Sequence, residues 1–278
     1  MEGSIEAFIL GVIQGWTEFL PVSSTAHLRI VPSLFHWNDP GTAFSAVLQL
    51  GTVVAIIVYF WKDLFKIYGS LISEIFTTGK VSSFDSKLGF WILLGTIPIC
   101  IFGYLLREPV ENGSVRNLYI VAGYLIFFGI LLLFAEMIAT QARTLDSINV
   151  LDALLIGVFQ AFSLIPGVSR SGVTLLCGLM LGFKRSHAAR FSFLLSVPAL
   201  LLSGIFEFNM LILNIRSFNA EHSWGSLLIG MLSACISGYF AIDFLLKYLQ
   251  THKTYIFVAY RVLLGSLIIY LYYNHMIS

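Results

Sequence analysis

Long apolar stretches alternate with short polar ones along the whole chain, and their lengths predict how the protein relates to a lipid bilayer. A helix needs about 20 mostly apolar residues to cross the hydrocarbon core of a membrane. Six stretches meet or approach this length, and we expect a membrane-spanning helix in each: residues 40–61, 88–106, 117–135, 191–206, 224–246 and 254–273.

Four further apolar pieces are too short to span a bilayer, and they come in two pairs. Residues 7–20 and 23–34 flank Pro21, and residues 153–165 and 171–183 flank Pro166. Pieces of about 10–14 residues are typical of re-entrant elements. Irregular backbone at membrane depth requires protein or a polar cavity to satisfy its polar groups, so we expect both breaks to line a cavity. On length alone, two kinked spanning helices are the alternative.

The sequence also repeats itself. Residues 7–14 resemble residues 153–160, and residues 44–48 resemble residues 191–195. Each half then holds one re-entrant pair and three spans, and because three is odd the second half enters from the opposite side. We therefore predict an all-α integral membrane protein, residues 1–278 in one polytopic domain. Its inverted repeats cover approximately 5–138 and 151–273, and its site lies near the membrane midplane.

Composition agrees with a membrane protein. Of the 278 residues, 58% are hydrophobic and 11% are charged, whereas soluble domains carry about 25% charged residues. The net charge of +1 gives no reason to expect a nucleic-acid partner. The three cysteines have no metal-binding spacing, and the N-terminus lacks the basic start of a cleavable signal peptide.

The distribution of basic residues predicts the orientation. With an outside N-terminus, the inside loops hold ten basic residues: Lys62, Lys66, Lys80, Lys87, Arg143, Lys184, Arg185, Arg190, Lys247 and Lys253. The outside segments hold four: Arg29, Arg107, Arg116 and Arg216. This excess inside obeys the positive-inside rule. In this layout the two breaks enter from opposite sides, so Glu18 and Arg170 can converge.

Glu18, just before the first break, is a costly charge for the interior of a membrane, and such charges are usually paired and functional. Gln14 lies four residues earlier and shares its helix face. A carboxylate and an amide oxygen form a partial site for a hard cation such as Mg²⁺ or Ca²⁺, completed by phosphate oxygens and water. Taken alone, Gln14 fits a helix-packing hydrogen bond equally well.

Four polar residues, Ser23, Ser24, Thr25 and His27, follow the first break. Ser24 or His27 can attack phosphorus while the other acts as a base or orients it. The remaining hydroxyls, Ser23 and Thr25, are candidates for binding phosphate. Each serine taken singly is more often a capping residue, and a lone histidine is more often structural.

The second break carries Arg170 between Ser169 and Ser171, with Thr174 one helical turn later. Arginine offers a bidentate fork to phosphate, and a following helix start offers free N–H groups. We therefore expect these four residues to bind phosphate, the alternative being an arginine paired with a buried acid. Arg261 is interpreted as structural or supporting.

These motifs resemble those of a known family. The run 11–27, with Gln14, Glu18 and His27, is similar to the first motif of the bacterial undecaprenyl pyrophosphate phosphatases, the integral-membrane type linked to bacitracin resistance. Residues 166–172 resemble the second motif, and Gln49–Gly51, 95–98 and Tyr260–Arg261 also fit. The likeness covers nearly the whole chain.

The resemblance implies removal of the terminal phosphate from a C55 polyprenyl pyrophosphate, which recycles the lipid carrier for cell-wall glycans. It implies a divalent cation, a multi-pass protein of the bacterial inner membrane and a site open to the extracytoplasmic side. It also implies catalytic roles for Glu18, Ser24, His27 and Arg170. Many members have glutamate where this chain has Gln14, which puts a two-carboxylate mechanism in doubt.

A transporter is the rival class, because inverted repeats and broken helices are also transporter features. Such a protein would bind and flip polyprenyl phosphate without hydrolysing it. Metal-dependent release of inorganic phosphate separates the two classes. The sequence leaves the oligomeric state open, with a homodimer as one option.

Overall fold

The computed structural model describes residues 2–37, 41–106, 117–213 and 224–277. Within these residues the regular elements are helices, apart from an isolated bridge between Arg143 and Phe183. They are α1 (Glu2–Phe19), α2 (Ser24–Phe35), α3 (Gly41–Thr78), α4 (Phe84–Leu105), α6 (Leu118–Ile138), η2 (Leu145–Ser147), α7 (Val150–Ala161), η3 (Phe162–Leu164), α8 (Arg170–Met180), α9 (Arg185–Leu213), α11 (Trp224–Thr251) and α12 (Tyr255–Tyr273).

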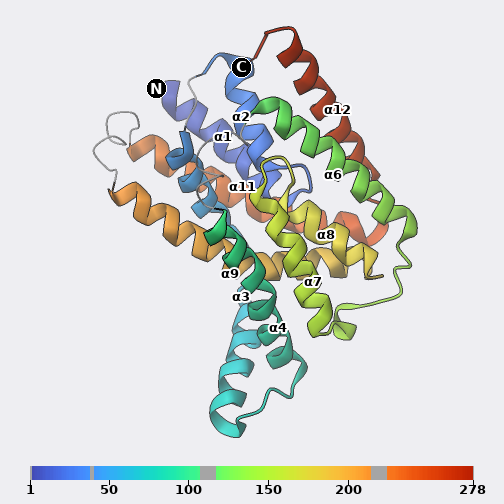
Figure 1. Ribbon diagram of the computed structural model, residues 1–278. Helices are drawn as coiled ribbons and strands as arrows, with labels where there is room; N and C mark the ends of the chain where they lie inside the picture. The colour runs from blue at the N-terminus through green and yellow to red at the C-terminus, as the bar shows by residue number, and fades with distance from the viewer. Residues whose placement is uncertain (1, 38–40, 107–116, 214–223, 278) are drawn as a thin grey trace.

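Six of these helices, α3, α4, α6, α9, α11 and α12, are long and apolar enough to cross a membrane. This confirms the prediction of an all-helical chain with six such helices, as expected of an integral membrane protein. α1 begins and α12 ends at the same end of the molecule (Figure 1), which suits an even number of crossings.

The helix that contains the first predicted span, α3, continues far past residue 61 to Thr78, with a kink at Phe60. One face of its last turns packs against α4. Ile67 and Leu71 are buried, and both contact the helix α4 at Gly89. α3 and α4 therefore project together from the rest of the molecule (Figure 1).

The broken helix pairs occur where the prolines predicted them. α1 ends at Phe19 and α2 begins at Ser24; α7 and η3 end at Leu164, and α8 begins at Arg170. α1 is longer than predicted, since it begins at Glu2 rather than at residue 7 and has 18 residues. Whether either pair is re-entrant stays a prediction.

Glycines bring the broken pairs close to neighbouring spans. A Cβ atom at Gly11 of α1 would lie 2.3 Å from the carbonyl oxygen of Gly230 in α11. A Cβ atom at Gly157 of α7 would lie 2.1 Å from the carbonyl oxygen of Gly95 in α4. Small residues of this kind allow membrane helices to approach backbone to backbone. Each broken pair thus packs tightly against a span from the other half of the chain.

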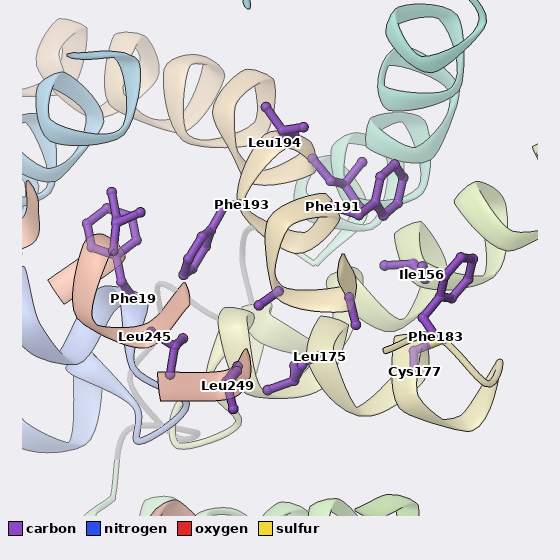
Figure 2. Packing of buried hydrophobic residues seen from close by; sticks show 14 of the residues in the cluster. Phe19, Ile156, Leu175, Cys177, Phe183, Phe191, Phe193, Leu194, Leu245 and Leu249 are labelled. Carbon is purple, nitrogen blue, oxygen red and sulfur yellow. The ribbon is translucent and has the colours of Figure 1, made fainter. Parts of the chain in front are cut away.

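Aromatic packing joins the first break to the core. Phe193 of α9 meets Phe19, the last residue of α1, edge to face at 5.6 Å between ring centroids (Figure 2). On α3, Phe60 lies 6.3 Å from Phe193. All three rings are buried, so the end of α1 is fixed against spans from both halves.

Polar contacts tie the helices together away from the breaks. The buried Glu136 of α6 forms an ion pair with Arg185 of α9 and accepts a hydrogen bond of 2.9 Å from the Thr254 hydroxyl, next to α12. Arg143, before α7, donates to Asp152 at 2.9 Å, and these hydrogen bonds raise the pKa of Arg143. Both arginines are therefore paired with carboxylates.

Three of the basic residues assigned to the outside, Arg107, Arg116 and Arg216, lie outside the described residues. The orientation inferred from the basic residues stays a prediction.

Replacing Gly157 by alanine is expected to destabilise the protein by about 1–3 kcal/mol, because the new methyl group forces α7 away from the backbone of α4. Thermal unfolding of the detergent-solubilised protein measures the effect. Gly69→Ala is the matched control, since a Cβ atom there meets nothing within 4 Å. Equal unfolding temperatures for the two variants would contradict the close packing of α4 and α7.

Candidate active site

The two breaks meet inside the protein. The hydroxyl of Ser171, at the start of α8, donates a hydrogen bond of 3.0 Å to the carbonyl oxygen of Leu20, in the first break. Nη1 of Arg170 lies 3.7 Å from Oε1 of Glu18. The structure thus brings together the two charges that the sequence singled out within its apolar stretches.

A serine with an unusual backbone conformation precedes the second helix of each pair. Ser23 has φ 73° and ψ 101°, and Ser169 has φ 71° and ψ 114°. Positive φ at a residue other than glycine costs on the order of 1–3 kcal/mol and persists only where the surroundings enforce it. Ser169 also caps α8 by accepting a hydrogen bond from the N–H of Gly172.

A cavity of about 70 Å³ opens between the breaks. Its walls are polar except for one isoleucine, and they come from α1, α2, α3, η3, α8 and both breaks: Thr17, Glu18, Ser23, Ser24, Thr25, Gln49, Ser163, Ile165, Ser169 and Arg170. Six of the predicted site residues therefore share one small polar space, namely Glu18, Ser23, Ser24, Thr25, Ser169 and Arg170.

Glu18 organises one side of this cavity. Its Oε2 accepts a hydrogen bond of 2.8 Å from the Ser24 hydroxyl and one of 3.2 Å from Nε2 of Gln14. The Ser24 oxygen is thus held beside a carboxylate that can take its proton, which is the relation between a nucleophile and its base.

Arg170, whose Nη1 lies within ion-pair distance of Glu18, presents donors to the cavity that form no hydrogen bond to any described residue. Nε and Nη1 of Arg170 are buried and have no hydrogen-bond partner in the described part of the chain. A guanidinium carries five N–H donors and no acceptor. Because buried donors are costly to leave unpaired, this arginine suits an anion that enters the cavity.

Gln14 and Glu18 together offer a partial site for a cation, although Gln14 itself does not line the described cavity. Oε1 of Gln14 is buried and unpaired, and it belongs to the side chain that bonds Glu18. Oxygen donors of this type suit Mg²⁺ or Ca²⁺. The described residues contain no group of three or more His, Cys, Asp or Glu side chains that could hold a metal. Phosphate oxygens and water would have to complete the coordination.

His27 lies behind the cavity rather than in its wall. Its Nδ1 is 2.7 Å from the carbonyl oxygen of Ser23, and its Nε2 is 2.6 Å from the hydroxyl of Tyr260 in α12. Because a carbonyl only accepts, Nδ1 carries the proton and Nε2 accepts from Tyr260. The role of His27 as nucleophile or base stays a prediction. The sequence did not identify Tyr260 as the hydrogen-bond partner of His27.

Two predicted phosphate ligands also lie outside the cavity wall. The Ser171 hydroxyl bonds the carbonyl oxygen of Leu20, and the Thr174 hydroxyl bonds the carbonyl oxygen of Arg170 and the hydroxyl of Ser192. These bonds hold α8 in place. Direct phosphate binding by Ser171 and Thr174 stays a prediction.

The sequence indicated no role for three polar residues of the cavity wall, Thr17, Gln49 and Ser163. Nε2 of Gln49 donates a hydrogen bond of 3.0 Å to the hydroxyl of Ser203 in α9. The buried hydroxyl of Ser163 has no partner among the described residues. The repeat held a signal for Ser163, because it follows Gln160 by the same spacing as Thr17 follows Gln14.

Comparison with known proteins agrees with these motifs. The family described as bacitracin resistance protein BacA matches residues 7–267. An undecaprenyl-diphosphatase of Myxococcus xanthus (strain DK1622) is 46% identical over 267 residues, which cover 96% of this chain and 88% of that protein. An undecaprenyl-diphosphatase of Gloeobacter violaceus (strain ATCC 29082 / PCC 7421) is 45% identical over 269 residues, 96% of this chain and 91% of that protein.

A third relative, the undecaprenyl-diphosphatase of Pelodictyon phaeoclathratiforme (strain DSM 5477 / BU-1), is 45% identical over 273 residues, which cover 96% of either chain. Matches of this identity and coverage extend over both breaks and all six long apolar helices. The chain therefore belongs to the bacitracin resistance protein BacA family.

Proposed function

We propose that this protein is a phosphatase that hydrolyses undecaprenyl diphosphate to undecaprenyl phosphate and inorganic phosphate. The observation that carries the proposal is the hydrogen bond from the Ser24 hydroxyl to Glu18, beside the Arg170 donors that form no hydrogen bond to the described residues. Nucleophile, base and phosphate clamp thus face one polar cavity. Membership of a family whose relatives are named undecaprenyl-diphosphatase supports the choice of substrate.

In this mechanism Glu18 accepts the proton of Ser24, and the serine oxygen forms a bond to the terminal phosphorus. The bond from that phosphorus to the bridging oxygen breaks, and undecaprenyl phosphate leaves with the electron pair. Water then attacks the phosphoserine, so that inorganic phosphate leaves and Ser24 regains its proton. Glu18 is preferred to His27 as the base because the structure pairs it directly with Ser24.

Positioning and electrostatics supply most of the rate enhancement in phosphoryl transfer. Arg170 directs its unpaired N–H donors at the transferred group, and Ser23, Thr25 and Ser169 contribute further hydroxyls around it. Glu18 and Gln14 would hold a divalent cation, Mg²⁺ or Ca²⁺, which would neutralise charge on the phosphate oxygens. The unpaired Oε1 of Gln14 supports this assignment.

We further propose that the chain is an inverted repeat with two re-entrant pairs. The packing supports an exchange between halves, since α1 packs against α11 whereas α7 packs against α4. Gly11 and Gly157, which occupy matching positions of the repeat, make the two close approaches. Ser23 and Ser169, which also match, share their unusual φ and ψ angles.

The excess of basic residues in the inside loops supports a cavity that opens to the extracytoplasmic side of the bacterial plasma membrane. The polyprenyl tail would then lie in lipid beside the helices while the diphosphate enters between the breaks.

Ser24→Ala is expected to lower the rate of phosphate release from undecaprenyl diphosphate by about 1,000-fold or more, because it removes the nucleophile. Ser33→Ala, on the same helix but bonded to the carbonyl oxygen of Arg29, is the matched control and should retain full activity. Both are assayed as purified protein in detergent. Absence of phosphate release from folded wild-type protein would reject hydrolysis and favour the transporter.

Phosphate release is expected to require Mg²⁺ or Ca²⁺ and to stop in chelator. Gln14→Glu should lower the half-saturating metal concentration by about tenfold, because a second carboxylate binds hard cations more strongly than an amide. Titration of activity against each metal measures both effects. Full activity in chelator would show that Glu18 serves as a base without any metal.

A further inference from the structure

Arg261 of α12 forms hydrogen bonds with the backbone of three separate segments. Among the side chains that the structure describes it is the largest that is fully buried, with 1% of its surface exposed. Its guanidinium donates to backbone carbonyl oxygens: Nε to Leu125 at 3.0 Å, Nη1 to Pro21 at 3.2 Å, and Nη2 to Gly167 at 3.3 Å and to Val168 at 3.0 Å. One side chain therefore bonds the first break, the second break and α6.

These carbonyl groups lie next to the strained serines. The carbonyl group of Val168 is bonded directly to the nitrogen of Ser169. The carbonyl group of Pro21 is bonded to the nitrogen of Val22, the residue before Ser23. Both serines line the cavity. Backbone of such conformation persists only where its surroundings enforce it. Arg261 is the side chain that bonds the backbone before both serines.

The charge of Arg261 has no carboxylate partner among the residues that the structure describes; its recorded bonds all go to carbonyl oxygens. Arg185 provides the contrast, because it too is largely buried but forms an ion pair with Glu136. A buried ion pair of this kind is enough to join two helices. The planar fork of an arginine, however, can bond carbonyl groups on two different segments at once.

We propose that Arg261 is a positioning residue for the reaction: it holds the two breaks in register so that Ser24, Glu18 and Arg170 face the same phosphoryl group. The proposal rests on the phosphatase function proposed above. Arg261 does not line the cavity, and it acts through the backbone that carries the cavity residues. Its loss should therefore affect the chemical step more than the binding of the lipid.

The first test is Arg261→Lys, which keeps the charge but removes the fork. We expect kcat per folded molecule to fall about 100-fold, because small displacements of reacting groups have effects of this size. KM should change by less than about threefold. Arg185→Lys is the control for loss of a buried arginine. Unchanged kcat in folded Arg261→Lys protein would overturn the proposal.

A second pair of variants reaches Arg261 without replacing it. A Cβ atom at Gly129 of α6 would lie 3.2 Å from Cβ, 3.5 Å from Nε and 3.7 Å from Cδ of Arg261. A Cβ atom at Gly123 of the same helix would meet nothing within 4 Å. Gly129→Ala should lower kcat by about three- to tenfold, whereas Gly123→Ala should not. Equal kcat values in this pair would overturn the proposal even if Arg261→Lys failed to fold.

A double-mutant cycle distinguishes positioning from simple loss of stability. If Arg261 acts through the placement of Arg170, adding Arg261→Lys to Arg170→Lys should lower kcat much less than it does in the wild-type background. An equal further loss in both backgrounds would assign Arg261 a purely structural role. Failure of the wild-type protein to release phosphate would reject the proposed function instead, and Arg261 variants with wild-type kcat would reject only the positioning role.

Discussion

The site depends on one constraint: backbone that leaves a helix inside an apolar protein must still form hydrogen bonds, because lipid offers none. At both breaks, side chains from elsewhere in the chain supply donors in addition to local backbone N–H groups. Arg261 bonds the carbonyl oxygens of Pro21 and Val168, and the Ser171 hydroxyl bonds that of Leu20. The bonds that satisfy one break therefore also place it against the other.

The second requirement is space, and the glycines supply it. Two broken pairs and six long helices share one helical body, and a short helix with bulky side chains on every face would keep the breaks apart. Gly11 and Gly157 allow α1 and α7 to reach the backbone of α11 and α4. The contact of Phe193 with Phe19 (Figure 2), together with Phe60, then fixes the end of α1, of which Glu18 is the neighbouring residue.

The sequence predicted the features that follow from solvation and chain breaks. Six apolar stretches correspond to six long helices, and Glu18 and Arg170, costly in an apolar interior, lie in one cavity. It could not predict what depends on tertiary packing. α3 continues past residue 61 because α4 covers it, and the contact between His27 and Tyr260 joins residues far apart in the chain. The hydrogen bonds of Arg261 to both breaks likewise depend on tertiary packing and could not be predicted from the sequence.

Gln14 has a consequence for the charge around the cavity. Among the described residues of its wall, Glu18 is the one carboxylate and Arg170 the one guanidinium, so their charges balance. Behind it lies Arg261, whose bonds go to carbonyl dipoles rather than to an acid. A glutamate at position 14 would add a negative charge next to Glu18 and repel a diphosphate unless a cation lay between them. With glutamine at position 14, the charges around the cavity already attract an anion. The amide oxygen of Gln14 can still serve as a ligand for a cation next to that anion.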